Sequence, residues 1–363
     1  MTPKKALIAM SGGVDSSVAA YLMRSAGYAC IGGMMRLFDG NILPQEQDSS
    51  CCSLDDAEDA RAVARRMNFP FYVFNAKDDF DEKVIQNFIR CYEWGETPNP
   101  CIDCNRYLKF DHLLRRAQEL GCNYIVTGHY ARIEQDSSSG RWLLYRAADL
   151  SKDQSYVLAC LNQRQLAHTI LPLGTMSKTE VRALAEQQNL INARKRDSQD
   201  ICFVPDGDYV SFMERYTGKK YETGDFLDLN GNIVGKHKGA VAYTLGQRKG
   251  LGIALGEPVY VCAKDMTRNT VTVGPNDALF ATTLEADDWN WIPFPELTKP
   301  MQVEAKARYN QPPRPATVYP GENGIARVVF DEPQRALTPG QAVVLYDGDL
   351  VVGGGTIRKI IQK

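Results

Sequence analysis

The stretch Ile8–Tyr21, IAMSGGVDSSVAAY, is typical of a strand that turns sharply into a helix. An apolar run from Lys5 leads into it, two glycines form the turn, and the helix begins after Asp15. Gly12 and Gly13 leave the backbone free to adopt positive φ and to approach a ligand closely. The first helical N–H groups have no intrahelical partner and lie at the positive end of the helix dipole. The sequence therefore predicts an anion site, and phosphate is the commonest anion at such a site.

This loop differs from two familiar phosphate-binding loops, because no GKS or GKT follows and G-x-G-x-x-G is absent. It resembles S-G-G-x-D-S, the PP-loop of the N-type ATP pyrophosphatases, which split ATP into AMP and pyrophosphate. The resemblance implies that ATP is bound by Ala9, Met10, Ser11, Gly12, Gly13, Val14, Asp15 and Ser16. Asp15 either helps to hold Mg²⁺ on the phosphates or only caps the helix. An ordinary strand–turn–helix is the alternative interpretation of the whole stretch.

The composition is that of a globular protein. A length of 363 residues predicts two or three domains. The content of 44% hydrophobic and 24% charged residues is ordinary for soluble globular proteins. Because no apolar run has the length of a membrane span and no signal peptide opens the chain, we expect a cytoplasmic protein. Ten cysteines in a reducing compartment indicate thiol, metal or sulfur chemistry. With a net charge of −2, the chain shows no overall basic signal for nucleic acid, so any contact with RNA must come from local patches.

Strands and helices alternate in the first part of the chain. Apolar runs at Ala29–Phe38 and Phe69–Asn75, separated by amphipathic stretches, predict a doubly wound parallel sheet. Ligands of such sheets bind beyond the carboxyl ends of the strands. Past Pro205 the strands are short and glycines frequent. We expect an α/β fold with a PP-loop ATP-binding catalytic domain over 1–205, a small mixed central domain over 206–283 and a C-terminal β-barrel over 284–363.

Two cysteine-bearing stretches have a polar character. Gly95–Phe110, GETPNPCIDCNRYLKF, has two prolines around an asparagine, so we expect a shaped loop and not a helix. Arg194–Val204 is expected to lead into a short strand bearing Cys202. Cys104 and Cys202 should both be reachable thiols. Cysteines in apolar contexts are expected to pack as small hydrophobic residues: Cys30, Cys122, Cys160 and Cys262.

Seven motifs, in order along the chain, resemble those of the bacterial tRNA-specific 2-thiouridylases, a PP-loop family. They are AMSGGVDS at Ala9–Ser16, TPNPxxxCN at Thr97–Asn105, TGHY at Thr127–Tyr130, KDQSY at Lys152–Tyr156, SQDICF at Ser198–Phe203, RY at Arg308–Tyr309 and GQ at Gly340–Gln341. The resemblance implies replacement of the C2 oxygen of wobble uridine 34 by sulfur, giving 2-thiouridine, AMP and pyrophosphate. Such chemistry needs an adenylated leaving group, a sulfur nucleophile and a thiol that resolves the resulting S–S bond.

The resemblance also implies roles for single residues. Cys202 carries a persulfide, and Cys104 is the nucleophile that forms a transient disulfide with it. Met35 lies beside the adenine and Gly128 lines the nucleotide pocket; a core methionine and a turn glycine are the alternatives. The flipped-out uridine would lie between the PP-loop and Cys104.

Contacts with tRNA are implied for Asn99, Pro100, Cys101, His129, Lys152, Asp153, Gln154, Arg308, Tyr309 and Gln341. An aromatic residue beside an arginine suits stacking on an unpaired base. For His129 the alternative is a structural role, and for Lys152–Gln154 a solvated helix start. Three basic clusters could follow the tRNA backbone or only form a solvated face: Lys219-Lys220, Lys236–Lys238 and Arg248-Lys249. The implied partners are the anticodon arm of tRNAs for Glu, Gln and Lys, and a cysteine desulfurase or persulfide carrier, with the protein itself a monomer.

The chain departs from the family pattern at Cys101, where N-P-D-x-x-C-N usually has an aspartate with a proton-transfer or base-contacting role. Cys101, Cys104 and Cys202 could together hold a [4Fe–4S] cluster with one open iron site. Cys101 is otherwise a neutral substitution or a spare resolving thiol. A zinc site that adds Cys51 and Cys52 is a weaker alternative.

Two other functions remain open from the sequence. An amide-forming PP-loop ligase would share the ATP loop but needs no paired cysteines. A non-catalytic iron–sulfur or sulfur-carrier protein that binds RNA would release no pyrophosphate with ATP and tRNA. The complete loop at Ser11–Ser16 is the feature that argues against the second alternative.

Overall fold

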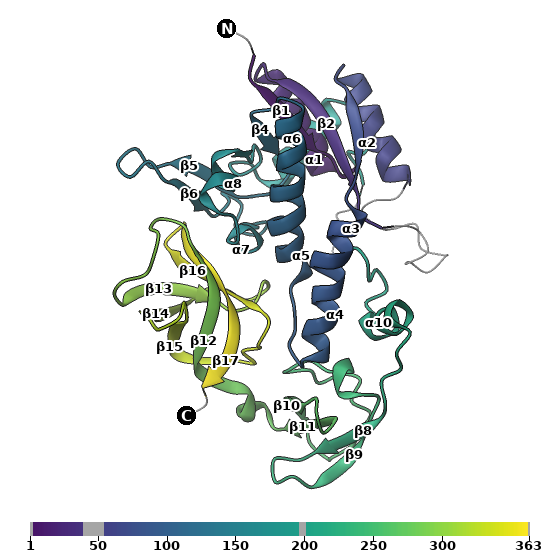
Figure 1. The fold of residues 1–363 in the computed structure, drawn as a ribbon, viewed down its shortest axis with the longest axis vertical. Coiled ribbons are helices and arrows are strands. Elements are labelled where there is room, and N and C mark those ends of the chain that lie inside the picture. Colours follow the sequence, from purple (N-terminus) through teal and green to yellow (C-terminus); the bar gives the residue numbers. More distant parts are fainter. Residues whose placement is uncertain (1–2, 39–53, 196–200, 362–363) are drawn as a thin grey trace.

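The computed structural model describes residues 3–38, 54–195 and 201–361. The chain forms three successive structural parts (Figure 1). A parallel sheet with its helices lies at the N-terminal end, a small strand-rich part lies at the opposite end, and a β-barrel lies beside the long helical column between them. Expectations that fall on Asp39–Ser50, Cys51, Cys52 and Ser198–Asp200 lie outside the described residues.

The N-terminal sheet has five strands in the order β3-β2-β1-β4-β7, and all its pairings are parallel. The strands are β1 Lys5–Ala9, β2 Ala29–Arg36, β3 Phe71–Asn75, β4 Tyr124–Val126 and β7 Thr169–Ile170. The chain moves outward from β1 through β2 to β3 and then returns to β4 on the other side of β1. This reversal creates the crevice at which doubly wound sheets bind ligands, and it confirms the predicted fold class.

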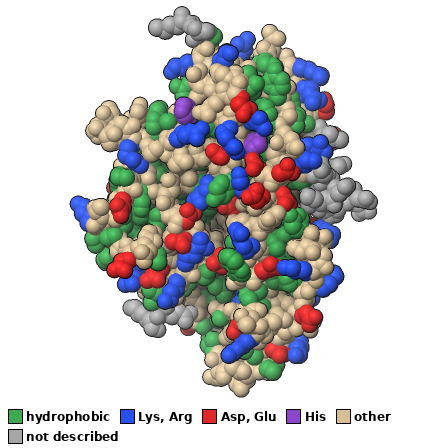
Figure 2. Space-filling view, viewed as in Figure 1, with side chains coloured by type: hydrophobic (Ala, Val, Ile, Leu, Met, Phe, Trp, Pro, Cys, Tyr) green, Lys and Arg blue, Asp and Glu red, His purple; other side chains and the backbone are tan. Residues whose placement is uncertain are grey.

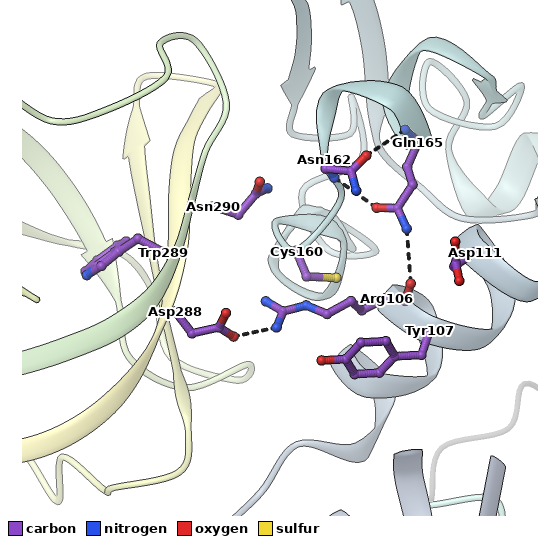
Figure 3. A pocket seen from close by; sticks show the side chains of 9 residues that line it. All are labelled: Arg106, Tyr107, Asp111, Cys160, Asn162, Gln165, Asp288, Trp289 and Asn290. Atoms are coloured by element: carbon purple, nitrogen blue, oxygen red, sulfur yellow. Dashed lines mark hydrogen bonds and ion pairs between the residues drawn. The ribbon is translucent and has the colours of Figure 1, made fainter. Parts of the chain in front are cut away.

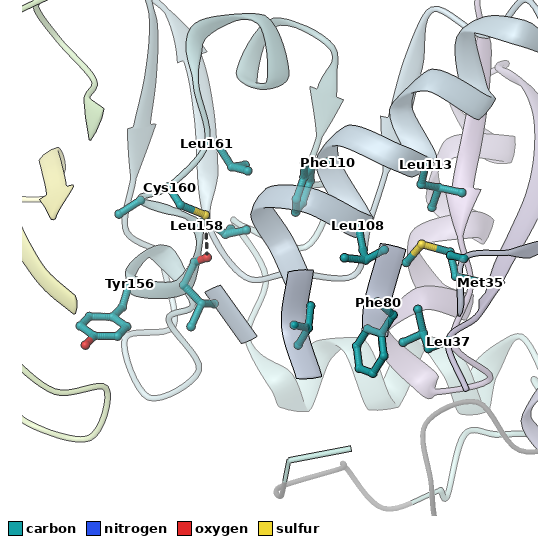
Figure 4. Close-up of a cluster of buried hydrophobic side chains, with 14 of the residues drawn as sticks. Met35, Leu37, Phe80, Leu108, Phe110, Leu113, Tyr156, Leu158, Cys160 and Leu161 are labelled. Atoms are coloured by element: carbon teal, nitrogen blue, oxygen red, sulfur yellow. Dashed lines mark hydrogen bonds between the residues drawn. The ribbon is translucent and has the colours of Figure 1, made fainter. Parts of the chain in front are cut away.

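Helices cover both faces of this sheet. Helices α1 Val14–Ser25 and α2 Leu54–Arg66 pack on one face, and α6 Leu113–Glu119 packs on the other. The other helices of this part of the chain are α3 Lys77–Phe80, η1 Asp81–Ile85, α4 Gln86–Glu93, α5 Pro100–Asp103, η2 Cys104–His112, α7 Ser155–Leu158, α8 Gln163–Ala167 and α9 Lys178–Gln187. A large buried cluster joins the sheet to the helical column, with Met35 and Phe80 against Leu108 and Phe110 (Figure 4). Each buried Leu or Phe side chain stabilises such a core by about 2 kcal/mol relative to exposure.

The expected loop at Gly95–Phe110 is largely helical, which corrects the sequence-based prediction. Helix α5 begins at Pro100, and the Asn99 side chain accepts a hydrogen bond from the Cys101 N–H at 3.2 Å. Proline is well suited to the first helical position because its missing N–H would have no partner there. The expected strand at Cys202 is also wrong, since 201–204 form a turn.

The central part of the chain follows helix α10 Tyr209–Thr217 and forms a four-stranded sheet in the order β10-β11-β8-β9. Its strands are β8 Gly224–Leu227, β9 Ile233–His237, β10 Tyr260–Asp265 and β11 Thr270–Gly274. Phe226, Val261 and Val271 are fully buried between the strands and the adjoining loops. This compact sheet contacts the C-terminal end of α4, where Gly95 lies against Met266.

The C-terminal strands close into a barrel, as predicted. The order β12-β15-β14-β13-β16-β17 is closed by pairing of β12 with β17. The strands are β12 Phe280–Trp291, β13 Met301–Lys306, β14 Arg314–Pro320, β15 Ala326–Arg335, β16 Ala342–Asp347 and β17 Leu350–Ile361. The hairpin of β5 Arg132–Gln135 and β6 Trp142–Tyr145 pairs with the first residue of β17, through Tyr145 and Leu350. The barrel is therefore attached to the N-terminal sheet domain. None of the described helices has the length and apolarity needed to cross a membrane.

Candidate functional site

The PP-loop lies at the carboxyl end of β1, between the strand and helix α1. Gly12 adopts φ +72°, and a Cβ added there would lie 2.5 Å from the Asp56 carbonyl oxygen of α2. Only glycine tolerates both the conformation and the close approach. The Ser16 and Ser17 hydroxyls donate to the Gly13 carbonyl at 3.0 and 3.1 Å. These contacts fix the turn between β1 and α1.

The Thr127–Tyr130 motif approaches the same helix start from the end of β4. A Cβ added to Gly128 would lie 2.8 Å from the Ser16 nitrogen, so the two backbones are in direct contact. His129 is buried, and its Nδ1 lies 2.8 Å from the Thr127 hydroxyl. Burial, with a smaller contribution from the charge of Lys109, holds the pKa of His129 well below its usual value. The imidazole is therefore neutral and held inside the protein.

Asp15 is held by two residues that the sequence analysis missed. Lys178 donates to both carboxylate oxygens at 2.8 Å, and the Tyr130 hydroxyl donates to Oδ1 at 2.8 Å. Lys178 is the first residue of α9, which starts with the capping box of Ser177 and Glu180. The capping box marks the helix start in the sequence, but nothing local to it indicates that this lysine reaches the PP-loop.

Asn192 is a third residue that the sequence did not indicate. Its buried side-chain nitrogen lies 3.0 Å from the Gly12 carbonyl, 3.2 Å from the Gly13 carbonyl and 2.7 Å from the Ser17 hydroxyl. Three residues further on, Lys195 pairs with Asp56 at 2.6 Å and with Asp59 at 2.7 Å. The segment before Cys202 is therefore tied to both the PP-loop and α2.

Other predicted nucleotide-binding residues contribute buried side chains. Met10, Val14 and Met35 are buried, and Met35 belongs to the large core cluster seen in Figure 4. Ala9 is partly buried against the same cluster. These buried side chains therefore contribute to the packing around the loop.

Cys104 and Cys202 pack against the same buried cluster from different parts of the chain. Cys104 is the first residue of η2, and Cys202 is adjacent to Phe203, which is buried against Phe80 and Phe88. Both cysteines are half-buried, whereas Cys101 is exposed, and none of the three is in a disulfide. Within 3–38, 54–195 and 201–361, no group of three or more His, Cys, Asp or Glu residues is placed to hold a metal ion.

The four cysteines expected to pack as hydrophobic residues have raised thiol pKa values. Burial raises the pKa of Cys30 to about 11 and that of Cys160 to about 12. The pKa values of Cys122 and Cys262 are also raised by burial. Thiols in such surroundings are poor nucleophiles at neutral pH.

Helix α5 and its continuation η2, which carry Cys101 and Cys104 and are called here the cysteine-bearing helix, are anchored to the C-terminal barrel. The Gln341 side-chain amide donates to the Thr97 and Pro98 carbonyls at 2.8 and 3.2 Å. The Thr97 N–H donates to the Pro339 carbonyl at 2.9 Å. A Cβ added to Gly340 would lie 2.9 Å from the Thr97 nitrogen. Pro100 is buried just after this junction, so Gln341 and Pro100 hold the loop in place.

Within the KDQSY motif, two of the predicted tRNA-binding side chains make internal contacts. The Asp153 carboxylate accepts from the Ala147 and Ser155 N–H groups and from the Ser155 hydroxyl. Gln154 accepts from the Tyr130 N–H at 3.0 Å. Lys152 is half-exposed beside them. The motif therefore supports the strand end that carries His129.

Arg308 and Tyr309 follow strand β13. One terminal guanidinium nitrogen of Arg308 donates to the Leu245 and Ala336 carbonyls and to the Thr338 hydroxyl, while its buried Nε has no hydrogen-bond partner. Tyr309 is 38% exposed, and Lys306 lies 5.3 Å from its ring centroid. Burial raises the pKa of Tyr309, with smaller contributions from the charges of Asp153 and Cys101.

Most of the basic clusters form ion pairs with nearby acids. Lys219 pairs with Glu93, Lys220 with Glu214 and Lys236 with Asp225, each at 2.6 to 2.7 Å. The Arg248-Lys249 pair is exposed. On the face shown in Figure 2, basic and acidic side chains are intermixed over much of the surface.

An open cavity of about 370 Å³ lies where η2 meets the barrel (Figure 3). Arg106 spans it and pairs with Asp288, while Asn162, Gln165 and Asn290 contribute amide groups. The cavity is lined by none of the residues that the sequence analysis assigned to ATP or tRNA. Since Asn290 also donates to the Ala159 and Leu161 carbonyls at 2.8 Å, this region joins the barrel to the sheet domain.

Comparison with known proteins gives matches along almost the whole chain. Three family models match in order: the tRNA methyl transferase HUP domain at 4–206, the tRNA methyl transferase PRC-barrel domain at 210–275 and the aminomethyltransferase β-barrel domain at 281–357. A 4-thiouridine synthetase solved with RNA and ATP is 16% identical, covers 59% of this chain and 50% of its own, and aligns with a TM-score of 0.34.

Several curated proteins of the same name are similar to this chain. The tRNA-specific 2-thiouridylase MnmA of Clostridioides difficile is 49% identical over 98% of this chain and 98% of its own. The protein of the same name from Clostridium acetobutylicum is 49% identical over 98% and 99%, and that of Acetivibrio thermocellus is 48% identical over 99% and 100%. The chain therefore belongs to the tRNA-specific 2-thiouridylase family.

Proposed function

We propose that the protein is an ATP-dependent tRNA sulfurtransferase that makes 2-thiouridine at position 34. The observation that carries the proposal is 49% identity to a tRNA-specific 2-thiouridylase over 98% of both chains. The PP-loop and the two half-buried cysteines support it, because they supply an anion site and two thiols around one core cluster. An amide-forming ligase would require the first feature but not the second.

In the first step ATP binds at the PP-loop with its phosphates toward the start of α1. The N–H groups of the first helical turn and the Ser11 hydroxyl are the donors for these phosphates. The C2 oxygen of uridine 34 attacks the α-phosphorus, and pyrophosphate leaves. Asp15 is the one carboxylate of the loop, and it is already engaged by Lys178, so it does not present an open Mg²⁺ ligand. The ion would then arrive bound to the ATP phosphates.

In the second step sulfur replaces the adenylated oxygen. Cys202, loaded as a persulfide, provides the terminal sulfur that bonds to C2, and AMP leaves with the former C2 oxygen. Cys104 attacks the Cys202 sulfur of the S–S bond, which releases the thiolated tRNA and leaves a Cys104–Cys202 disulfide. A cysteine desulfurase or a persulfide carrier would reload Cys202 after reduction.

A [4Fe–4S] cluster on Cys101, Cys104 and Cys202 fits the structure less well. The three thiols do not form a metal-binding group among the described residues. Cys101 is exposed, while Cys104 and Cys202 pack against the core. A cluster needs its thiolates to converge on one site. We therefore assign the chemistry to persulfide and disulfide exchange.

For tRNA recognition, Tyr309 is the residue best placed to stack on an unpaired base. It is 38% exposed and has the Lys306 ammonium beside its ring. Lys152 and the Arg248-Lys249 pair supply accessible positive charge. The roles of Arg308, Gln341, Asp153 and Gln154 are then to hold this surface in shape. We propose that the protein acts on the anticodon arm as a cytoplasmic monomer.

The test is production of 2-thiouridine from ATP, unmodified tRNA and a sulfane sulfur donor, with pyrophosphate measured in the same reactions. Cys104→Ser and Cys202→Ser should each lower 2-thiouridine formation at least about a thousandfold, because each removes a nucleophile. Cys91→Ser, which changes another half-buried cysteine, is the control and should leave it unchanged. Pyrophosphate release without 2-thiouridine, unchanged in both serine variants, would favour a ligase, and absence of pyrophosphate release would favour a non-catalytic RNA-binding protein.

A further inference from the structure

Cys101 is the exposed thiol of a C-x-x-C pair that the two steps above do not use. It lies in the first turn of α5, three residues before Cys104, and the helical path continues without a break from α5 into η2. It is exposed, whereas Cys104 and Cys202 are both half-buried. The three sulfurs therefore differ in their access to solvent, and only Cys101 presents an exposed side chain.

We propose that Cys101 is the resolving thiol that moves the disulfide from the protein interior to its surface. The inference rests on the proposed function, which leaves Cys104 and Cys202 joined after each turnover. In that state Cys202 cannot accept sulfur, and both cysteines are half-buried, which hinders the approach of a protein reductant. A third thiol that reaches Cys104 from the solvent side solves this access problem.

The helical spacing permits this exchange. Residues three apart on an α-helix have Cα atoms about 5 Å apart, and disulfides form between Cα atoms about 4.4–6.8 Å apart. The Cys101 N–H donates to the Asn99 side chain at 3.2 Å, in the first helical turn, where N–H groups have no intrahelical partner. The exchange therefore requires adjustment only within the first turn of α5.

The step balances as a thiol–disulfide exchange. The Cys101 thiolate attacks the Cys104 sulfur, the Cys104–Cys202 bond breaks, and a Cys101–Cys104 bond forms. Cys202 leaves as a thiolate and takes up one proton, which matches the proton that Cys101 lost. No electrons are gained or lost in this exchange. An external dithiol then supplies two electrons to the exposed Cys101–Cys104 disulfide and returns both thiols.

The first test maps the disulfide after one turnover without reductant. Persulfide-loaded protein is mixed with ATP and tRNA, free thiols are alkylated, and the peptides are identified by mass spectrometry. The proposal predicts a Cys101–Cys104 disulfide with alkylated Cys202 in the native protein, and a Cys104–Cys202 disulfide in Cys101→Ser. Accumulation of the Cys104–Cys202 disulfide in the native protein would overturn the proposal.

The second test measures repeated turnover with a protein dithiol as the reductant. Cys101→Ser should give about one product per chain and then a steady rate about tenfold lower. A small phosphine, which reaches half-buried disulfides, should restore that rate. Cys262→Ser is the matched control and should behave as the native protein. Equal steady rates in Cys101→Ser and the native protein would contradict the proposal, whereas no first product in any of the proteins would contradict the proposed function itself.

Discussion

The PP-loop and the cysteine-bearing helix are stabilised in different ways. The PP-loop is shaped largely by its own residues, since Ser16 and Ser17 bond to Gly13 within four positions. The start of the cysteine-bearing helix is held from a distance, because Gln341 reaches Thr97 and Pro98 across more than 240 positions of the chain. A local motif therefore shapes the turn of the ATP loop, which Lys178 and Asn192 then support from a distance, whereas the position of the cysteines depends on docking of the C-terminal barrel.

The largest effect that tests this comparison is expected for Gly12→Ala. The new Cβ would lie 2.5 Å from the Asp56 carbonyl, and alanine is strained at φ +72°. We expect the free energy of unfolding to fall by about 3 kcal/mol and ATP binding to be lost. Denaturant unfolding and nucleotide titration measure the two quantities.

The matched control is Gly27→Ala, which has φ +83° and open space around the position of its Cβ. This variant introduces the conformational strain without a steric clash. We expect its free energy of unfolding to fall by about 1 kcal/mol and its ATP binding to be unchanged. If the two variants lost equal stability, the tight contact between the PP-loop and α2 would not be a constraint on the fold.

Lys178→Met tests the long-range partner of the ATP loop. The Lys178 side chain is 12% exposed, and its removal leaves the Asp15 carboxylate without a countercharge next to the phosphates. We expect KM for ATP to rise about tenfold, with a smaller change in kcat. Steady-state kinetics at varied ATP measures this.

Lys219→Met is the control, because its ion pair with Glu93 is largely exposed and exposed pairs contribute little. An unchanged KM in Lys178→Met would show that the PP-loop needs no support from α9. The ATP loop would then be specified wholly by its local sequence, and it would differ from the cysteine-bearing helix more than we propose.

Gln341→Leu tests the anchor of the cysteine-bearing helix. Loss of two hydrogen bonds to Thr97 and Pro98 should lower the free energy of unfolding by about 2 kcal/mol. Thermal unfolding measures the loss, and Gln334→Leu, which removes a bond on the exposed surface of the barrel, is the control. If Gln341→Leu weakened tRNA binding without any loss of stability, Gln341 would be a direct tRNA contact and not an anchor.

A smaller effect is expected from His129. Because the folded pKa is held below the ordinary value of 6.5, the unfolded chain binds more protons at acid pH. The stability due to neutral His129 is complete above pH 6.5 and is lost as the pH falls toward the folded pKa, by at most about 1.4 kcal/mol per pH unit. His129→Gln should therefore show a shallower loss of stability below pH 6.5. Identical slopes in the native and variant proteins would contradict the burial of a neutral imidazole.

The sequence was sufficient to predict the parallel sheet, the C-terminal barrel and the position of the PP-loop, because each depends on local periodicity or on a short motif. It did not predict helix α5, since Pro100 was interpreted as a helix breaker when it is a favourable first residue. Lys178 and Asn192 could not be predicted, because they contact the PP-loop from more than 160 residues away. The assignments of Arg308 and Gln341 to tRNA stay predictions, and both side chains make internal hydrogen bonds here.

The most direct test of the whole account is nucleoside analysis of tRNA after one turnover of persulfide-loaded protein with ATP. The account predicts one 2-thiouridine at position 34 for each AMP and pyrophosphate released, and no thiolated product in Cys202→Ser. Pyrophosphate release without 2-thiouridine in the native protein, or the same yield in Cys202→Ser, would contradict the central claim that the PP-loop and Cys202 act on one uridine.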